Sequence, residues 1–172
     1  RAALEERLTQ AAEAKRGCGT LKTAVASAAM AADSVVGHKL QALQEKQLTQ
    51  LKGIEGRWAV LGDCSGSMET AIEMARQIAA ILARMAKGAV HLIFFNTVPN
   101  YANATGLTLE TLTMVTQGIV ASGGTSIGCG VQYLADRGLV VDGIALISDG
   151  GENELPYLAP TWRRYADRVG VA

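Results

Sequence analysis

The sequence of 172 residues lacks the features that mark several classes of protein. It has no run of about 18 uninterrupted apolar residues, which argues against a membrane-spanning helix. Its 16 basic and 16 acidic residues give zero net charge, which argues against a general polyanion-binding protein. Its three cysteines, Cys18, Cys64 and Cys129, form no CxxC pair, which excludes a thioredoxin-type motif and a zinc ribbon. We expect a cytoplasmic protein with buried free thiols.

Hydrophobic residues make up 49% of the chain, enough for a sizeable core, and the first part of the sequence reads as helical. Apolar residues follow helical spacing over Leu21–Val36, and Gly37 ends that predicted helix. The glutamine-rich stretch 38–52 predicts a connecting helix or linker. We therefore expect a helical arm and linker at 1–55 and a separate domain at 56–172.

From Trp58 onward, short apolar runs alternate with segments of helical periodicity. The apolar runs are Trp58–Gly62, Ala89–Phe95 and Ile144–Ile147. The helical segments are 68–87, 109–117, 126–137 and 160–169, and a loop-rich stretch covers 97–108. Short apolar runs bounded by glycine or polar residues favour strands that are buried on both faces of a parallel sheet. The alternation predicts an α/β fold, with an open, mostly parallel sheet and helices on both of its faces.

Polar residues follow each predicted strand, at the edge of the sheet where α/β proteins bind ligands. The segments concerned are Gly62–Met68, Asn96–Thr97 and Ser148–Asn153, together with the loop Ser122–Ser126 that precedes a helix. Carboxylates and hydroxyls therefore gather at one edge. Such hard oxygen ligands, without histidine or cysteine, suit a small divalent cation such as Mg²⁺.

The pattern Asp63-x-Ser65-x-Ser67, with Thr125 in a Gly-Gly-Thr loop and Asp149-Gly after a strand, resembles the metal-ion-dependent adhesion site of von Willebrand factor A (vWA) domains. The resemblance implies a Rossmann-like vWA fold that binds Mg²⁺ or Mn²⁺. Ser65 and Ser67 would ligate the metal directly, Thr125 directly or through water, and Asp63 and Asp149 would hold coordinated waters. The family sheet has more strands than this chain supplies, so we expect a domain truncated at its C-terminus.

The same resemblance implies a non-enzymatic function. vWA domains of this kind leave one metal position for an Asp or Glu of a protein partner, and we expect such a partner and no membrane association. The Ser-Gly-Ser-Met ending of the first motif is more similar to intracellular and bacterial members than to integrins.

An alternative is a vWA part of a Ro-like (TROVE) ribonucleoprotein. The lead-in Ala-Ala-Asp-Ser at 31–34 is similar to that of Ro family members, in which a ring of helical repeats before the vWA domain binds RNA. Residues 1–57 hold nine basic and six acidic residues, a net charge of +3, whereas 58–172 hold seven and ten, a net charge of −3. RNA contact is therefore expected only through the arm or through regions beyond this chain.

Two enzymatic interpretations fit less well. A metal-assisted phosphatase could use Asp63 as nucleophile, but Ser65 stands where such enzymes place a second Asp, and no lysine follows Lys87. The run Gly62–Gly66 resembles the Gly-Asp-Ser-Gly-Gly run of chymotrypsin-type proteases, but Cys64 interrupts it. A triad also needs a base oriented by a third group. The two histidines do not suit that role, because His38 lies in the helical arm and His91 lies within an apolar run.

Overall fold

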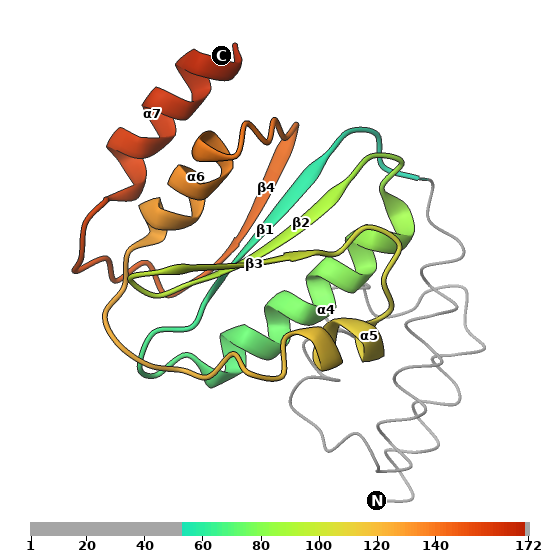
Figure 1. Cartoon of the computed structure of the whole chain (residues 1–172), viewed down its shortest axis with the longest axis horizontal. Coiled ribbons are helices and arrows are strands. Elements are labelled where there is room, and N and C mark those ends of the chain that lie inside the picture. The colour runs from blue at the N-terminus through green and yellow to red at the C-terminus, as the bar shows by residue number, and fades with distance from the viewer. Residues whose placement is uncertain (1–52, 171–172) are drawn as a thin grey trace, which may run out of the picture. The chain divides into compact units, whose positions relative to one another are not determined.

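A computed structural model of the chain describes residues 53–170 (Figure 1). The chain divides into two compact units, Arg1–Gly53 and Ile54–Ala172. The predicted helical arm and linker lie outside the described residues, except for the positions at 53–55. The described part of the second unit is an α/β domain.

The domain is built on a four-stranded sheet with the strand order β3-β2-β1-β4. Its strands are β1 (Trp58–Asp63), β2 (Val90–Phe95), β3 (Pro99–Asn103) and β4 (Gly143–Ile147). Strand β1 pairs in parallel with β2 and β4, whereas β3 runs antiparallel to β2. The predicted α/β class, with an open and mostly parallel sheet, is confirmed. Strand β3 was expected to be loop, because its residues, Pro-Asn-Tyr-Ala-Asn, carry no apolar run.

Four helices cover the two faces of this sheet, as predicted (Figure 1). Helices α4 (Glu69–Met85) and α5 (Leu109–Val115) lie on one face. Helices α6 (Ile127–Asp136) and α7 (Leu158–Val169) lie on the other. Within the described part of the chain, no helix is long and apolar enough to cross a membrane.

The two faces of the sheet carry two separate hydrophobic cores, because successive side chains of a strand point to opposite sides. Along β1, Val60 joins the core beneath α4, whereas Ala59 and Leu61 join the core beneath α6. Along β2, Phe94 and Phe95 divide in the same way. All five side chains are at most 1% exposed, so the centre of the sheet is a rigid base for the loops that follow it.

Glycine at position 62 allows α4 to pack closely against the C-terminal end of β1. A Cβ atom placed on Gly62 would lie 2.5 Å from the Cβ of Ala75 and 3.0 Å from Cδ1 of Phe94. These separations are shorter than van der Waals contact, so no side chain fits at this position. Close packing of α4 therefore fixes the start of the loop that contains Asp63.

Strand β4 is less buried than its sequence predicts. The apolar run Ile144–Ile147 was expected to be covered on both faces, yet its residues are partly buried and Leu146 is 42% exposed. The reason is its place in the sheet, since among the described strands β4 has one neighbour, β1. Both faces of β4 still contribute to the cores. Ala145 and Ile147 contact the core beneath α4, and Ile144 contacts the core beneath α6.

Candidate metal site

Asp63 ends β1 at the edge of the sheet where the parallel strands terminate, and it is fully buried. Its Oδ1 accepts a hydrogen bond of 2.9 Å from the backbone N–H of Ser65. Its Oδ2 accepts one of 2.7 Å from the hydroxyl of Ser148. Both carboxylate oxygens therefore have protein donors. This arrangement suits a carboxylate that reaches a metal through water rather than one that binds it directly.

Two hydroxyls of the predicted set are buried without a protein partner. Ser65 and Thr125 are each 6% exposed, and within the described part of the chain neither side-chain hydroxyl makes a hydrogen bond. Ser67 lies on the exposed part of the same loop as Ser65. A buried hydroxyl without a partner costs about 1–3 kcal/mol. Two such groups beside a buried carboxylate are the donor set that a hard divalent cation would satisfy.

Backbone hydrogen bonds hold the loop after β1 against the loop before α6. The N–H of Gly66 donates to the carbonyl of Gly123 over 3.1 Å, and the N–H of Ser122 donates to the carbonyl of Cys64 over 2.8 Å. The first motif and the Gly-Gly-Thr motif, which are about 60 residues apart in the sequence, are thus adjacent in space. The position of Thr125 in the site follows from this pairing.

Asn96, directly after β2, joins the same group of loops. Its Nδ2 donates to the carbonyl of Ser122 over 3.0 Å, and its own carbonyl accepts from the N–H of Ser126 over 2.7 Å. Its Oδ1 accepts from the N–H of Thr97. Because both polar atoms of its side chain and its carbonyl make these hydrogen bonds, we assign Asn96 to the support of the loop before α6 and not to the metal ligands.

Asp149, the last residue of the predicted set, is exposed. Its Oδ1 accepts a hydrogen bond of 2.9 Å from the N–H of Gly151. Its neighbour Ser148 contacts Asp63, so the loop after β4 reaches the loop after β1. The structure therefore places all five predicted residues on three loops that touch one another, with Asp63 and Ser65 at the centre.

Sequence reasoning missed two residues that position Thr125 and the helix after it. Asn153 Oδ1 accepts from the N–H of Thr125 over 2.8 Å. The carboxylate of Glu152 accepts from the N–H groups of Ile127 and Gly128 at the start of α6, over 3.0 and 3.2 Å. It also accepts from Leu158 N–H, at 2.8 Å, at the start of α7. A carboxylate at two helix N-termini also interacts favourably with both helix dipoles. The only signal in the sequence was the polar run after β4, which does not specify these partners.

The charged residues of these loops all have the same sign. The segments 64–70, 96–98, 119–126 and 148–157 contain Glu69, Asp149, Glu152 and Glu154 but no lysine or arginine. Nearby acidic groups without basic partners attract a cation. Among the described residues, no group of three or more His, Cys, Asp or Glu could hold a metal, so the hydroxyls are essential to this donor set.

The two described cysteines are poor ligands or nucleophiles at neutral pH. Burial, together with the negative charge of Asp63, raises the pKa of the Cys64 thiol to about 11. Burial likewise raises the pKa of Cys129 to about 11. Both are free thiols. They remain protonated, which fits the expectation that they are buried core residues.

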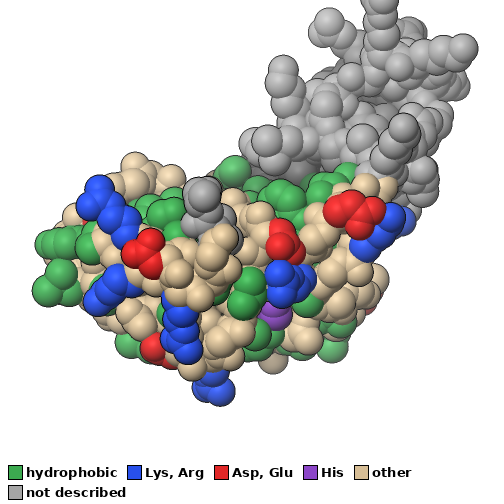
Figure 2. All heavy atoms as spheres, turned by 90° about the horizontal axis from the view of Figure 1, so that it is seen from above, with side chains coloured by type: hydrophobic (Ala, Val, Ile, Leu, Met, Phe, Trp, Pro, Cys, Tyr) green, Lys and Arg blue, Asp and Glu red, His purple; other side chains and the backbone are tan. Residues whose placement is uncertain are grey.

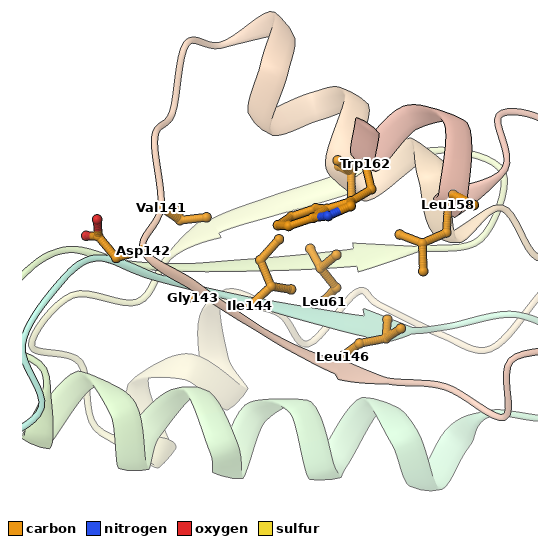
Figure 3. A pocket seen from close by; sticks show the side chains of 10 residues that line it. Leu61, Val141, Asp142, Gly143, Ile144, Leu146, Leu158 and Trp162 are labelled. Atoms are coloured by element: carbon orange, nitrogen blue, oxygen red, sulfur yellow. The ribbon is translucent and has the colours of Figure 1, made fainter. Parts of the chain in front are cut away.

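A separate apolar pocket of about 570 Å³ lies between β4 and α7 (Figure 3). Figure 3 shows the ring of Trp162 over Ile144 and Leu61, with Leu146 farther along β4 and Leu158 at the start of α7. Its lining contains none of the five predicted metal-site residues. The pocket follows from the partial burial of β4 and is not part of the candidate metal site.

No protein-family model matches this sequence, and no curated protein matches it. Among solved structures, the chain is similar to the Ro (RSR) protein of Deinococcus radiodurans, with 21% sequence identity and a TM-score of 0.64. The match covers 98% of this chain and 39% of that protein, so the chain spans less than half of its length. This likeness supports the predicted α/β fold.

Proposed function

We propose that this chain is a divalent-metal-dependent protein-binding module of the vWA type. Asp63, Ser65, Ser67, Thr125 and Asp149 would hold Mg²⁺ or Mn²⁺, and the partner would present an Asp or Glu carboxylate. The observation that carries the proposal is the pair of buried, unpartnered hydroxyls of Ser65 and Thr125 beside the fully buried Asp63. These are hard oxygen donors of the kind that Mg²⁺ prefers.

The residues have different parts in this proposal. Asp63, held by Ser65 N–H and Ser148 O–H, would fix the position of a coordinated water. The hydroxyls of Ser65 and Thr125 are neutral donors, so they would leave the charge of the ion largely uncompensated. A bound Mg²⁺ supplies the positive charge that attracts and orients a carboxylate. Exposed Ser67 marks the open side of the site, where the partner would approach.

Hydrogen bonding at Asp63 favours this function over the phosphatase alternative. Both oxygens of Asp63 accept hydrogen bonds of at most 2.9 Å, which hold the carboxylate in place and lower its nucleophilicity. His91 is paired through Nδ1 with the hydroxyl of Tyr101, 3.0 Å away. His91 also lies near the opposite end of β2 from Phe95, the residue aligned with Asp63. It is therefore not placed to act as a catalytic base at the candidate site. We therefore propose binding without catalysis.

Isothermal titration of the full chain with MgCl₂ and MnCl₂ tests the proposal. We expect weak binding by the unaltered protein and a loss of at least about tenfold in affinity for Thr125→Val and Ser67→Ala, since each removes one oxygen donor. Ser122→Ala is the matched control, because it removes an exposed hydroxyl outside the donor set. No binding by the unaltered chain, or equal losses in the control, would refute the proposal.

A second candidate function is that of a part of a Ro-like RNA-binding particle. It is favoured by the structural likeness to the Deinococcus Ro protein over nearly the whole chain. In this case the basic arm would contact RNA, because the domain that follows it carries a net negative charge.

Electrophoretic mobility shifts with a hairpin RNA that carries a single-stranded tail test this second candidate. Arg7, Lys15, Arg16 and Lys22 are replaced by glutamine in one variant. The control variant replaces Arg163 and Arg164 on α7. Salt-sensitive binding that is lost only in the arm variant supports the candidate. Equal binding by both variants contradicts it.

A further inference from the structure

Exposed apolar side chains lie on the loops that carry or adjoin the candidate metal site. Val98, Val120, Leu155 and Tyr157 are 59%, 66%, 72% and 43% exposed, and together they form what we term the apolar rim. Isolated exposed hydrophobic residues are ordinary on protein surfaces. Four of them on the loops around one polar site require an explanation, because the remaining exposed residues of these loops are polar, acidic or small.

Two members of the apolar rim lie beside the loop that precedes α6. The N–H of Val98 donates to Oδ1 of Asn96 over 2.9 Å, and Nδ2 of Asn96 donates to the carbonyl of Ser122. Val120 is two residues before Ser122, whose N–H is bound to the carbonyl of Cys64. These hydrogen bonds connect both valines to the loop before α6, which contains Ser122 and Thr125.

The other two members belong to the loop before α7. Leu155 follows Glu154, whose N–H donates to the carbonyl of Thr125 over 3.0 Å. Tyr157 follows Pro156, whose carbonyl accepts a hydrogen bond of 2.8 Å from the hydroxyl of Ser126. In Figure 2, hydrophobic side chains reach the surface at the left-hand end, where the loop before α7 lies in Figure 1. Apolar surface therefore adjoins Thr125 on this side too.

The charges of the same loops limit the partner that this surface can accept. Glu69, Asp149 and Glu154 are exposed, and these loops contain no basic residue. With a divalent ion offsetting Asp63 and Asp149, the remaining charged side chains of these loops, Glu69, Glu152 and Glu154, are all acidic. A second acidic group on the partner would be repelled, as would a polyphosphate chain. A partner with one carboxylate at the ion and uncharged groups around that carboxylate would avoid this repulsion.

On this basis we propose that the partner presents a single Asp or Glu flanked on both sides by apolar residues, which pack on the apolar rim. This inference rests on the proposed function, because the carboxylate is held only through the metal. Binding of the flanking side chains removes apolar surface from water, and this adds affinity without adding charge. Polyacidic segments and RNA are disfavoured at this site.

Capped tripeptides serve as probes for this chemistry, titrated into the full chain in saturating MnCl₂ and followed by calorimetry. We expect acetyl-Leu-Glu-Leu-amide to bind at least about fivefold more tightly than acetyl-Gly-Glu-Gly-amide or acetyl-Glu-Glu-Glu-amide. Acetyl-Leu-Gln-Leu-amide, and all four peptides in EDTA, should not bind. Equal affinities of the Leu-flanked and Gly-flanked peptides would overturn the proposal, as would tighter binding of the triacidic one.

Variants of the apolar rim locate the effect. Leu155→Ser and Val98→Ser should remove the advantage of the Leu-flanked peptide while leaving Mn²⁺ affinity unchanged. Met114→Ser, an equally exposed apolar residue on α5, is the control and should retain the advantage. If the chain binds Mn²⁺ but the Leu155 and Val98 variants behave like the control, the apolar rim is refuted and the metal site stands. If the chain binds no metal, both proposals fail.

Discussion

The hydroxyl of Ser148 donates a hydrogen bond of 2.7 Å to Oδ2 of Asp63, across 85 residues of sequence. The same hydroxyl oxygen accepts the N–H of Gly150 over 3.0 Å. One side chain thus fixes the orientation of the Asp63 carboxylate and shapes the turn that carries Asp149. Ser148 therefore connects the two acidic residues of the candidate site without being one of its predicted ligands.

The role of Ser148 leads to a prediction about metal affinity. Ser148→Ala leaves Oδ2 of Asp63 without its donor, and we expect Mg²⁺ affinity to fall by about tenfold, as is typical when a group supporting a ligand is removed. Ser148→Thr keeps the hydroxyl and should retain most of the affinity. Calorimetric titration measures both values. Equal affinities in the alanine variant and the unaltered protein would show that Ser65 N–H alone orients Asp63.

Glu152 is expected to stabilise the contact between α6 and α7. Glu152→Gln removes the negative charge that accepts three backbone N–H groups, and should lower the free energy of unfolding by about 1–3 kcal/mol. Glu154→Gln is the control, since Glu154 is exposed and makes its hydrogen bond to Thr125 through the backbone. Urea denaturation followed by circular dichroism compares the two. A loss as large in the control would contradict the assignment.

Glycine at position 128 is expected to be irreplaceable. A Cβ there would lie 2.3 Å from the carbonyl oxygen of Pro156 and 2.6 Å from the carbonyl carbon of Tyr157, and backbone atoms cannot move aside as a flexible side chain can. Gly128→Ala should therefore destabilise the domain by about 2 kcal/mol or more. Gly118→Ala, where a Cβ meets nothing within 4 Å, is the control. Thermal unfolding of the two variants gives the comparison.

His91 should make stability depend on pH. Burial lowers the pKa of its imidazole in the folded protein, so as pH falls below about 6.5 the unfolded chain takes up a proton that the folded chain resists. The free energy of unfolding should therefore decrease between about pH 7.5 and about pH 5.5. In His91→Gln this decrease should be smaller. Identical pH profiles of the two proteins would contradict the burial effect.

Local patterns predicted the helices and the central strands because their residues decide them directly. The helical period over 68–87 corresponds to α4, and the apolar run at Ala89–Phe95 corresponds to β2. Strand β3 was not predicted, because it has no apolar run of its own. It is held by antiparallel pairing with β2, from Phe95↔Pro99 to His91↔Asn103, and this pairing exists only once β2 is in place.

For the candidate site too, one part could be predicted from the sequence and another part could not. The sequence by itself determined which oxygen donors end each strand, from Asp63 to Asp149, because strand ends and loops follow from local composition. Only the tertiary structure decided that Ser65 and Thr125 would be buried without hydrogen-bond partners among residues 53–170, and that Ser148 would hold Asp63. These properties depend on hydrogen bonds between segments distant in the sequence, and such pairings are set by the packing of the helices and the sheet rather than by any local pattern.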